Sequence, residues 1–161
     1  MPQGKSRGAS SSRWARWREL SLREQRATLA AALLIPAARL ALRTRGAAWT
    51  TDRLLRRPLG ARVGGLDDLA SARELARAVG RASNNGPYAG NCLSRSLALL
   101  WMLRGRGIVG ELRYGARTAD GKLEAHAWVE LNGRVLNDRQ DVETRFARFG
   151  SDPVPRARTG P

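Results

Sequence analysis

The hydrophobic pattern of this chain changes its period once, near Gly107, and this change limits the possible folds most. Before it, leucines and alanines recur three or four residues apart, which predicts amphipathic helices. After it, apolar and polar residues alternate, which predicts strands. Helices followed by an antiparallel sheet predict an α+β domain. The chain has 161 residues, enough for one such domain and too few for two ordinary ones.

The helical part is predicted to begin at a capping box, in which Ser21 and Glu24 satisfy each other's backbone N–H groups. The helix that follows should be kinked at Pro36, because proline removes a donor and crowds the preceding turn. A second short helix is expected over residues 49–56. We predict that residues 21–60 form a helical layer over the core. The alternative is a docking surface for a partner protein or a membrane.

Two further segments complete the helical part. An amphipathic helix is expected over residues 67–82, and the turn-forming residues 83–90 follow it. Asn91 should then cap a helix that ends at Gly105 and Gly107.

The alternating part predicts three antiparallel strands, over about residues 108–118, 123–131 and 134–138. The hairpins should turn at residues 119–121 and at the asparagine and glycine of 132–133.

The predicted domain covers residues 21–150. A flexible basic tail rich in serine, glycine and arginine is expected at 1–20, and a second flexible tail with prolines at 151–161.

The charge balance is strongly basic, with 29 lysines and arginines against 14 acidic residues, a net charge of +15. Such an excess is typical of proteins that bind nucleic acid, anionic membranes or acidic peptides. The alternative is an arginine-rich composition that covers the solvated faces, since the arginines are scattered and do not form one stripe.

Several classes of protein are excluded by what the sequence lacks. One cysteine allows no intramolecular disulfide, and one cysteine with one histidine cannot form a common zinc site. No phosphate loop or dinucleotide fingerprint is present, so neither a cofactor nor a metal is predicted. The longest apolar run without a charge, residues 27–38, is too short to span a bilayer. We therefore expect a cytoplasmic protein without a transmembrane segment.

Cys92 is predicted to lie in the first turn of the helix capped by Asn91. Unpaired backbone N–H groups and the helix dipole favour the thiolate there, and the thiolate is the nucleophilic form of cysteine. This placement suits covalent catalysis. The alternative is a small buried apolar residue, which is the usual role of a free cysteine.

His126 lies on the middle predicted strand, where alternation places it on one face with Trp128 and Glu130. Its neighbours Ala125 and Ala127 are small and leave room around the imidazole ring. A lone histidine on a strand is otherwise a surface residue or a hydrogen-bonded core residue.

The position of Asp138 relative to His126 depends on the second hairpin. A two-residue loop at 132–133 turns Asp138 to the face opposite His126. A three-residue loop at 131–133 places the two directly opposite each other, with β-carbons roughly 4.5–5.5 Å apart. The glycine at the last loop position favours the three-residue loop. We therefore predict a triad of Cys92, His126 and Asp138.

With these residues in place, the chain resembles a known family. Residues 91–138 are similar to the leader peptidase of lasso-peptide biosynthesis, a member of the transglutaminase-like (papain-like) cysteine proteases. Cys-Leu-x-Arg-Ser-Leu at Cys92–Leu97 resembles the nucleophile motif of that family, and His-Ala-Trp-Val-Glu at His126–Glu130 resembles its histidine motif. Asp138 falls where the family places its aspartate. The N-terminal helices, residues 20–59, are similar in pattern.

The resemblance implies a cysteine peptidase that removes the leader from a ribosomally made precursor peptide. A separate ATP-dependent cyclase then closes the macrolactam ring. The implied partners are the precursor, a leader-recognition protein and, as a further candidate, the cyclase. The chain resembles the stand-alone type of peptidase, without a fused recognition domain, and no nucleic-acid partner is implied.

The implied roles follow the order of the reaction. Cys92 attacks the scissile carbonyl, His126 moves the proton, and Asp138 fixes the tautomer of the imidazole. The backbone N–H of Cys92 is the expected oxyanion donor, since it lies at a helix start.

Four other residues are candidates for binding the substrate. Asn85 and Tyr88 are candidates for the second oxyanion donor. Arg95, one turn after the cysteine, is either structural or holds the substrate backbone. Trp128 either walls the cleft or belongs to the core.

Two rival functions fit part of the pattern. Another transglutaminase-like enzyme would transfer the acyl group to an amine with the same residues. A non-enzymatic basic module would bind nucleic acid or an acidic leader, as the net charge of +15 suggests. That module predicts that Cys92→Ala preserves function and that binding falls steeply with salt. It leaves the combination of Cys92, His126 and Asp138 unexplained.

Overall fold

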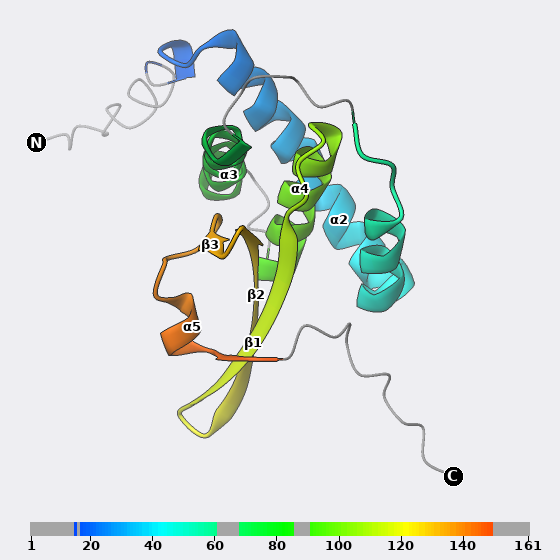
Figure 1. Cartoon of the computed structure of the whole chain (residues 1–161), viewed down its shortest axis with the longest axis vertical. Coiled ribbons are helices and arrows are strands. Elements are labelled where there is room, and N and C mark those ends of the chain that lie inside the picture. Colours follow the sequence, from blue (N-terminus) through cyan, green and yellow to red (C-terminus); the bar gives the residue numbers. More distant parts are fainter. Residues whose placement is uncertain (1–14, 16, 61–67, 86–90, 150–161) are drawn as a thin grey trace, which may run out of the picture.

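Two hydrophobic clusters, on opposite faces of one antiparallel sheet, organise the fold. The computed structural model describes residues 15, 17–60, 68–85 and 91–149 (Figure 1). In the described part of the chain, three long helices precede the sheet, and a short helix lies between the last two strands of the sheet. The elements are α2 (Leu22–Leu55), α3 (Asp68–Asn85), α4 (Cys92–Gly105), β1 (Glu111–Ala119), β2 (Lys122–Leu131), β3 (Arg134–Val135), α5 (Val142–Arg145) and β4 (Ala147–Arg148). The predicted α+β class is confirmed.

Helix α2 begins at the predicted capping box. The Glu24 backbone N–H donates to Ser21 Oγ, and the Glu24 carboxylate accepts from the Ser21 backbone N–H. The kink is not at the predicted Pro36, because the helix continues past it. The backbone leaves helical geometry at Gly46, with φ 80° and ψ 168°. Glycine accepts a positive φ without a steric penalty, which allows the backbone to leave helical geometry at this position. The predicted short helix, 49–56, is the arm of α2 after this break.

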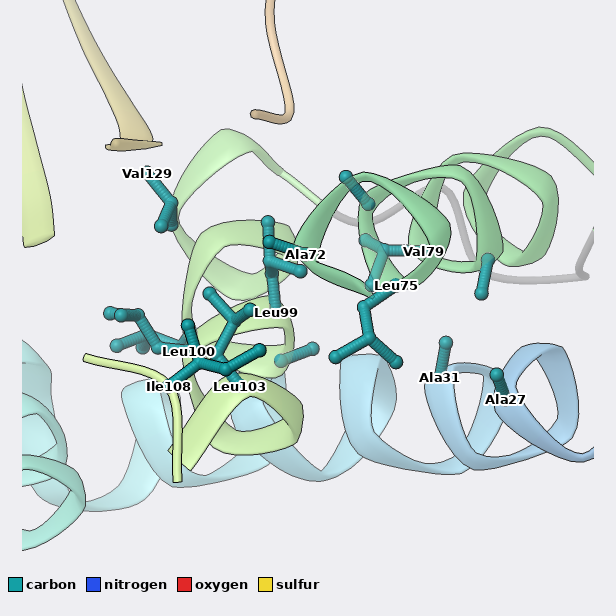
Figure 2. Close-up of a cluster of buried hydrophobic side chains, with 14 of the residues drawn as sticks. Ala27, Ala31, Ala72, Leu75, Val79, Leu99, Leu100, Leu103, Ile108 and Val129 are labelled. Carbon is teal, nitrogen blue, oxygen red and sulfur yellow. The ribbon is translucent and has the colours of Figure 1, made fainter. Parts of the chain in front are cut away.

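The first cluster fills the space between the three long helices (Figure 2). One face of α2 meets α3 and α4 through alanines, which let the helix backbones come close. The labelled members are Ala27, Ala31, Ala72, Leu75, Val79, Leu99, Leu100, Leu103, Ile108 and Val129. Because Val129 belongs to β2, the helices and the sheet share this core.

Helix α4 starts and ends as its sequence predicts. The Ser94 backbone N–H donates to Asn91 Oδ1 at 2.8 Å, so Asn91 caps the helix at Cys92. Gly107 has a φ of 73° just after the helix end, which turns the chain toward β1.

The sheet has the strand order β3-β2-β1-β4, and both hairpins have two-residue loops. In the second hairpin Leu131 pairs with Arg134. Asn132 and Gly133 both have a positive φ, 50° and 73°, as a type I′ turn requires. The predicted three-residue loop is therefore wrong, because Asn132 and Gly133 alone form the complete two-residue turn.

The last strands differ most from the prediction. Strand β3 ends at Val135, and the expected strand to residue 138 does not form. Instead the side chain of Asn137 accepts from the Val129 backbone N–H at 2.8 Å, taking the place of a backbone partner. Helix α5 and strand β4 were not predicted, and β4 pairs with β1 through Gly115 and Ala116.

Helix α2 is long and apolar enough to cross a membrane by length and composition alone, although core helices and signal sequences pass the same test. Its most apolar 18-residue window is only 22% buried. The predicted tails and most of the predicted turn at 83–90 lie outside the described residues.

Candidate active site

Cys92 is the first residue of α4 and is partly exposed. The Asn91 side chain occupies the N–H of Ser94, so the cap leaves the first-turn amides at Cys92 outside the helical hydrogen-bond ladder. The positive end of the helix dipole therefore lies beside the sulfur, as the sequence predicts.

His126 and Asp138 lie in direct contact. His126 Nε2 donates to Asp138 Oδ2 at 2.5 Å, and both side chains are mostly buried. The contact does not arise from paired strands, as the sequence analysis expected. It forms because the chain leaves the sheet after Val135 and carries Asp138 to the ring of His126.

Two more groups hold the Asp138 carboxylate. Its Oδ1 accepts from the Arg139 backbone N–H and from Arg145 Nη2, each at 2.7 Å. Burial of the carboxyl group raises the pKa of Asp138, whereas the hydrogen bonds from His126, Arg139 and Arg145 lower it. The hydrogen bonds have the larger combined effect, so the pKa of Asp138 lies below its ordinary value. Asp138 is therefore a carboxylate that fixes the Nε2–H tautomer of His126.

An aromatic ring covers the imidazole of His126. Phe146 stacks on it, with ring centroids 4.7 Å apart and planes at 23°. Gly115, which pairs with His126 across the sheet, makes room for this ring. A β-carbon at Gly115 would lie 3.0 Å from Phe146 Cβ and 3.1 Å from Trp128 Cη2. Gly115 is thus a structural requirement of the site.

Trp128 belongs to the core and does not wall a cleft. It is fully buried, in the second cluster with Val135, Val142 and Phe146. Its Nε1 donates to Glu130 Oε1 at 2.7 Å.

A hydrogen-bond network fastens α4 to the strand that carries His126. Ser96 Oγ donates to the Ala127 carbonyl oxygen at 3.0 Å, and Asn137 Nδ2 donates to Ser96 Oγ at 2.9 Å. Ser96 lies four residues after Cys92, on the same face of the helix. The network therefore brings the start of α4 close to β2 and ties both to the segment that ends in Asp138.

The structure does not join the nucleophile to the base. Within the described ranges, no hydrogen bond connects Cys92 to His126. Because Asp138 occupies Nε2, the other ring nitrogen, Nδ1, is left to exchange a proton with the thiol. Among the residues that the structure describes, no group of three or more histidine, cysteine or acidic side chains is placed to hold a metal ion.

Three predicted substrate-binding candidates remain, Arg95, Asn85 and Tyr88. Arg95 is half-buried, and its Nε is a buried atom without a hydrogen-bond partner. Asn85 ends α3, but its side chain lies outside the described part, as does Tyr88.

Sequence reasoning missed four residues of the site, namely Ser96, Asn137, Arg145 and Phe146. Ser96 lies within the nucleophile motif beside Arg95, and Asn137 directly precedes Asp138, and these neighbours were the available signal. Arg145 and Phe146 follow the last predicted strand and carried no recognisable pattern.

A family model described as the transglutaminase-like superfamily matches residues 31–151. The match spans the helical core, the start of α4 and the whole sheet. No curated protein and no solved structure matches the chain.

Proposed function

Because the chain belongs to the transglutaminase-like superfamily, we propose that it is a cysteine peptidase that removes the leader from a lasso precursor peptide. The superfamily includes cysteine proteases and acyltransferases. The observation that carries the proposal is the 2.5 Å contact of His126 with Asp138, beside the strand to which the Cys92 helix is fastened. The resemblance of the two motifs to lasso leader peptidases supports the substrate class.

In the proposed reaction, His126 takes the thiol proton of Cys92 through Nδ1. The sulfur attacks the carbonyl carbon at the end of the leader, and negative charge moves to the carbonyl oxygen. The Cys92 backbone N–H, at the helix start, is placed to stabilise that charge. His126 then gives its proton to the leaving amine as the C–N bond breaks, and a thioester remains.

Water completes the proposed cycle. It attacks the thioester carbon and gives a proton to His126, and the C–S bond breaks to release the leader. His126 returns the proton to the sulfur. Asp138 remains ionised throughout and holds the ring in one tautomer and one orientation.

We further propose that a leader-recognition protein presents the precursor and that the product passes to a separate cyclase. The resemblance of the motifs at Cys92–Leu97 and His126–Glu130 to those of lasso leader peptidases supports this view.

The decisive experiment is mass spectrometry of a precursor peptide incubated with the protein. Wild type and Cys92→Ala are compared, each with and without the recognition protein. Cleavage of one peptide bond by wild type only is the expected result. Cleavage by both proteins, or by neither with the partner present, would contradict the proposal. Transfer of the leader to an added amine in preference to water would identify an acyltransferase.

A second test needs no substrate, because Cys92 is the only thiol in the chain. Its rate of alkylation by iodoacetamide at mildly acidic pH reports the thiolate directly. Wild type is expected to react faster than His126→Ala, and the recognition protein should widen the difference. Equal rates for both proteins under both conditions would remove His126 from the mechanism.

A further inference from the structure

The outer face of α2 is apolar although it lies on the surface. Four leucines at helical spacing line it, Leu22, Leu29, Leu33 and Leu40, with exposed fractions of 73%, 57%, 74% and 64%. We call these four residues the leucine stripe. The opposite face of α2 packs into the core through Ala27, Ala31 and Ile35, so the stripe is not needed to build the fold.

The charges around the stripe are of one sign. Arg26 lies one turn from Leu22 and Leu29, and Arg43 lies one turn from Leu40, and both arginines are exposed. Glu24 and Asp52 are the only acidic residues of α2. Glu24 forms an ion pair with Arg81 at 2.9 Å, and Asp52 forms one with Arg56 at 2.8 Å.

A groove beside the stripe repeats this combination of apolar and cationic groups. It has a volume of about 620 Å³ and lies between α2, α3 and the end of α4. Leu22, Ala30 and Met102 are among the apolar residues that line it, and Arg23, Arg26 and Arg106 supply three guanidinium groups.

One carboxylate, that of Glu74, faces two of these arginines. It lies 3.3 Å from Arg23 and 3.8 Å from Arg106. Arg106 Nη1 and Glu74 Oε1 are nevertheless both buried without a hydrogen-bond partner. An anionic group in the groove would supply an acceptor for Arg106.

From these observations we infer that α2 docks on the surface of a membrane that contains anionic phospholipid. The leucine stripe enters the boundary between headgroups and acyl chains, and Arg26 and Arg43 meet the headgroups. A lipid phosphate takes the groove beside Arg23 and Arg106. Arginines at both ends of an apolar face are the pattern of a helix that lies in the plane of the interface. Spanning the bilayer would instead require α2 to leave the core it shares with α3 and α4.

The test is flotation of the full-length protein with vesicles of phosphatidylcholine alone, or with phosphatidylglycerol added. Binding to the anionic vesicles is expected, and it should weaken at high salt because salt screens the arginines. Leu33→Asn is expected to lower the partition coefficient roughly tenfold, since it removes one buried leucine side chain from the interface. Arg26→Gln should lower binding to anionic vesicles only.

Matched controls come from the sheet. Leu123, 76% exposed on β2, is as accessible as Leu33, and Arg134 is an exposed arginine in the second hairpin. Leu123→Asn and Arg134→Gln should bind as wild type does. Melting temperatures measured by circular dichroism would show that all four variants remain folded.

Three outcomes would overturn the inference. Wild type that floats with neither kind of vesicle does not dock on membranes. Equal losses for Leu33→Asn and Leu123→Asn would place the contact elsewhere on the molecule. Absence of flotation together with loss of self-association or of recognition-protein binding in Leu33→Asn would assign the leucine stripe to a protein partner.

Discussion

At the residue scale, Asp138 is shared by two basic side chains. His126 holds one carboxylate oxygen, and Arg145 holds the other at 2.7 Å. Arg145 touches neither the sulfur nor the imidazole, so its role is to position the carboxylate. It is also one of the groups that lower the pKa of Asp138.

Arg145→Gln is expected to reduce kcat/KM for leader removal roughly tenfold, because a hydrogen bond to a charged group contributes about 1.5–3 kcal/mol. Loss of this group raises the pKa of Asp138 toward its ordinary value. The fall of activity in acid should then begin at a higher pH than in wild type. Arg145→Lys keeps the charge and should recover part of both effects. A pH series of cleavage rates measures them.

Arg139→Gln is the matched control for this prediction. The Arg139 side chain is 77% exposed and pairs with Asp141, whereas only its backbone N–H contacts Asp138. An identical pH profile for the two glutamine variants would show that Arg145 does not position Asp138.

The sequence predicted the contact of His126 with Asp138 through the wrong hairpin register. The preferred three-residue loop placed the two side chains on paired strands. In the structure the irregular segment after Val135 brings them together, with the side chain of Asn137 in place of a strand partner. Arg145 and Phe146 could not be predicted, because their roles depend on where the chain returns after α5.

At the scale of elements, Glu130 joins three strands. It lies on β2, and its carboxylate accepts from Arg113 of β1 at 3.1 Å and from Arg148 of β4 at 2.8 Å. Burial raises the pKa of Glu130, whereas hydrogen bonds from Trp128 and Arg113 and the charge of Arg148 lower it by more than burial raises it. The net shift is downward.

Glu130→Gln is expected to lower the free energy of unfolding by about 1.5–3 kcal/mol at neutral pH. A carboxyl group whose pKa is lower in the folded state stabilises the fold above the unfolded pKa. That contribution disappears as the pH falls through the folded pKa. The stabilities of wild type and variant should therefore converge in acid, as urea unfolding at several pH values would show.

Glu124→Gln serves as the control for Glu130. Glu124 pairs with Arg117 on the exposed part of the hairpin, at 2.7 Å. Its loss should cost less than about 1 kcal/mol, because water screens exposed pairs. A difference between wild type and Glu130→Gln that stays constant with pH would contradict the assigned role.

Two glycines should respond in opposite directions to alanine. Gly115→Ala crowds Phe146 and Trp128 and is expected to destabilise the fold by about 1–3 kcal/mol and to slow cleavage. Gly80 lies inside α3, where an added β-carbon meets no atom within 4 Å. Gly80→Ala should stabilise by about 0.4–1 kcal/mol. Thermal unfolding of both variants measures the two changes in stability, and the cleavage rate of Gly115→Ala measures the effect on the site. An increase in stability in Gly115→Ala would contradict the packing described.

Strong periodicity made α3, α4 and the first hairpin predictable from the sequence. The break in α2 was assigned to Pro36 instead of Gly46, because a proline inside a helical pattern is the more obvious interruption. Strand β4 spans two residues, Ala147 and Arg148, and is fixed by pairing with β1. No local pattern can mark a strand of that length.

At the scale of the whole molecule, α2 belongs to the core of the fold. Its buried residues Ala27, Ala31, Ile35 and Leu54 share one cluster with α3, α4 and β2. The sequence predicted a helical layer over the core at residues 21–60, with a docking surface as the alternative. The shared cluster means that these residues cannot be removed without loss of packing.

A chain without residues 1–60 is expected to lose its cooperative unfolding transition. It exposes the α2 side of the core and leaves cavities where Ala31, Ile35 and Leu54 were packed. Circular dichroism during heating would measure this. A chain without residues 1–14 is the control and should melt as wild type does, since the described core begins after that segment. A sharp transition in the shorter chain would contradict the shared core.

The position of Asp138, Arg145 and Phe146 near the end of the described chain sets the order in which activity arises on the ribosome. The nucleophile Cys92 emerges with the helices, 46 residues before Asp138, which orients its base. A nascent or prematurely terminated chain that ends before residue 138 therefore carries the thiol of Cys92 without the carboxylate that orients the proposed base. Translation thus completes the proposed active site only when Asp138, Arg145 and Phe146 have been added.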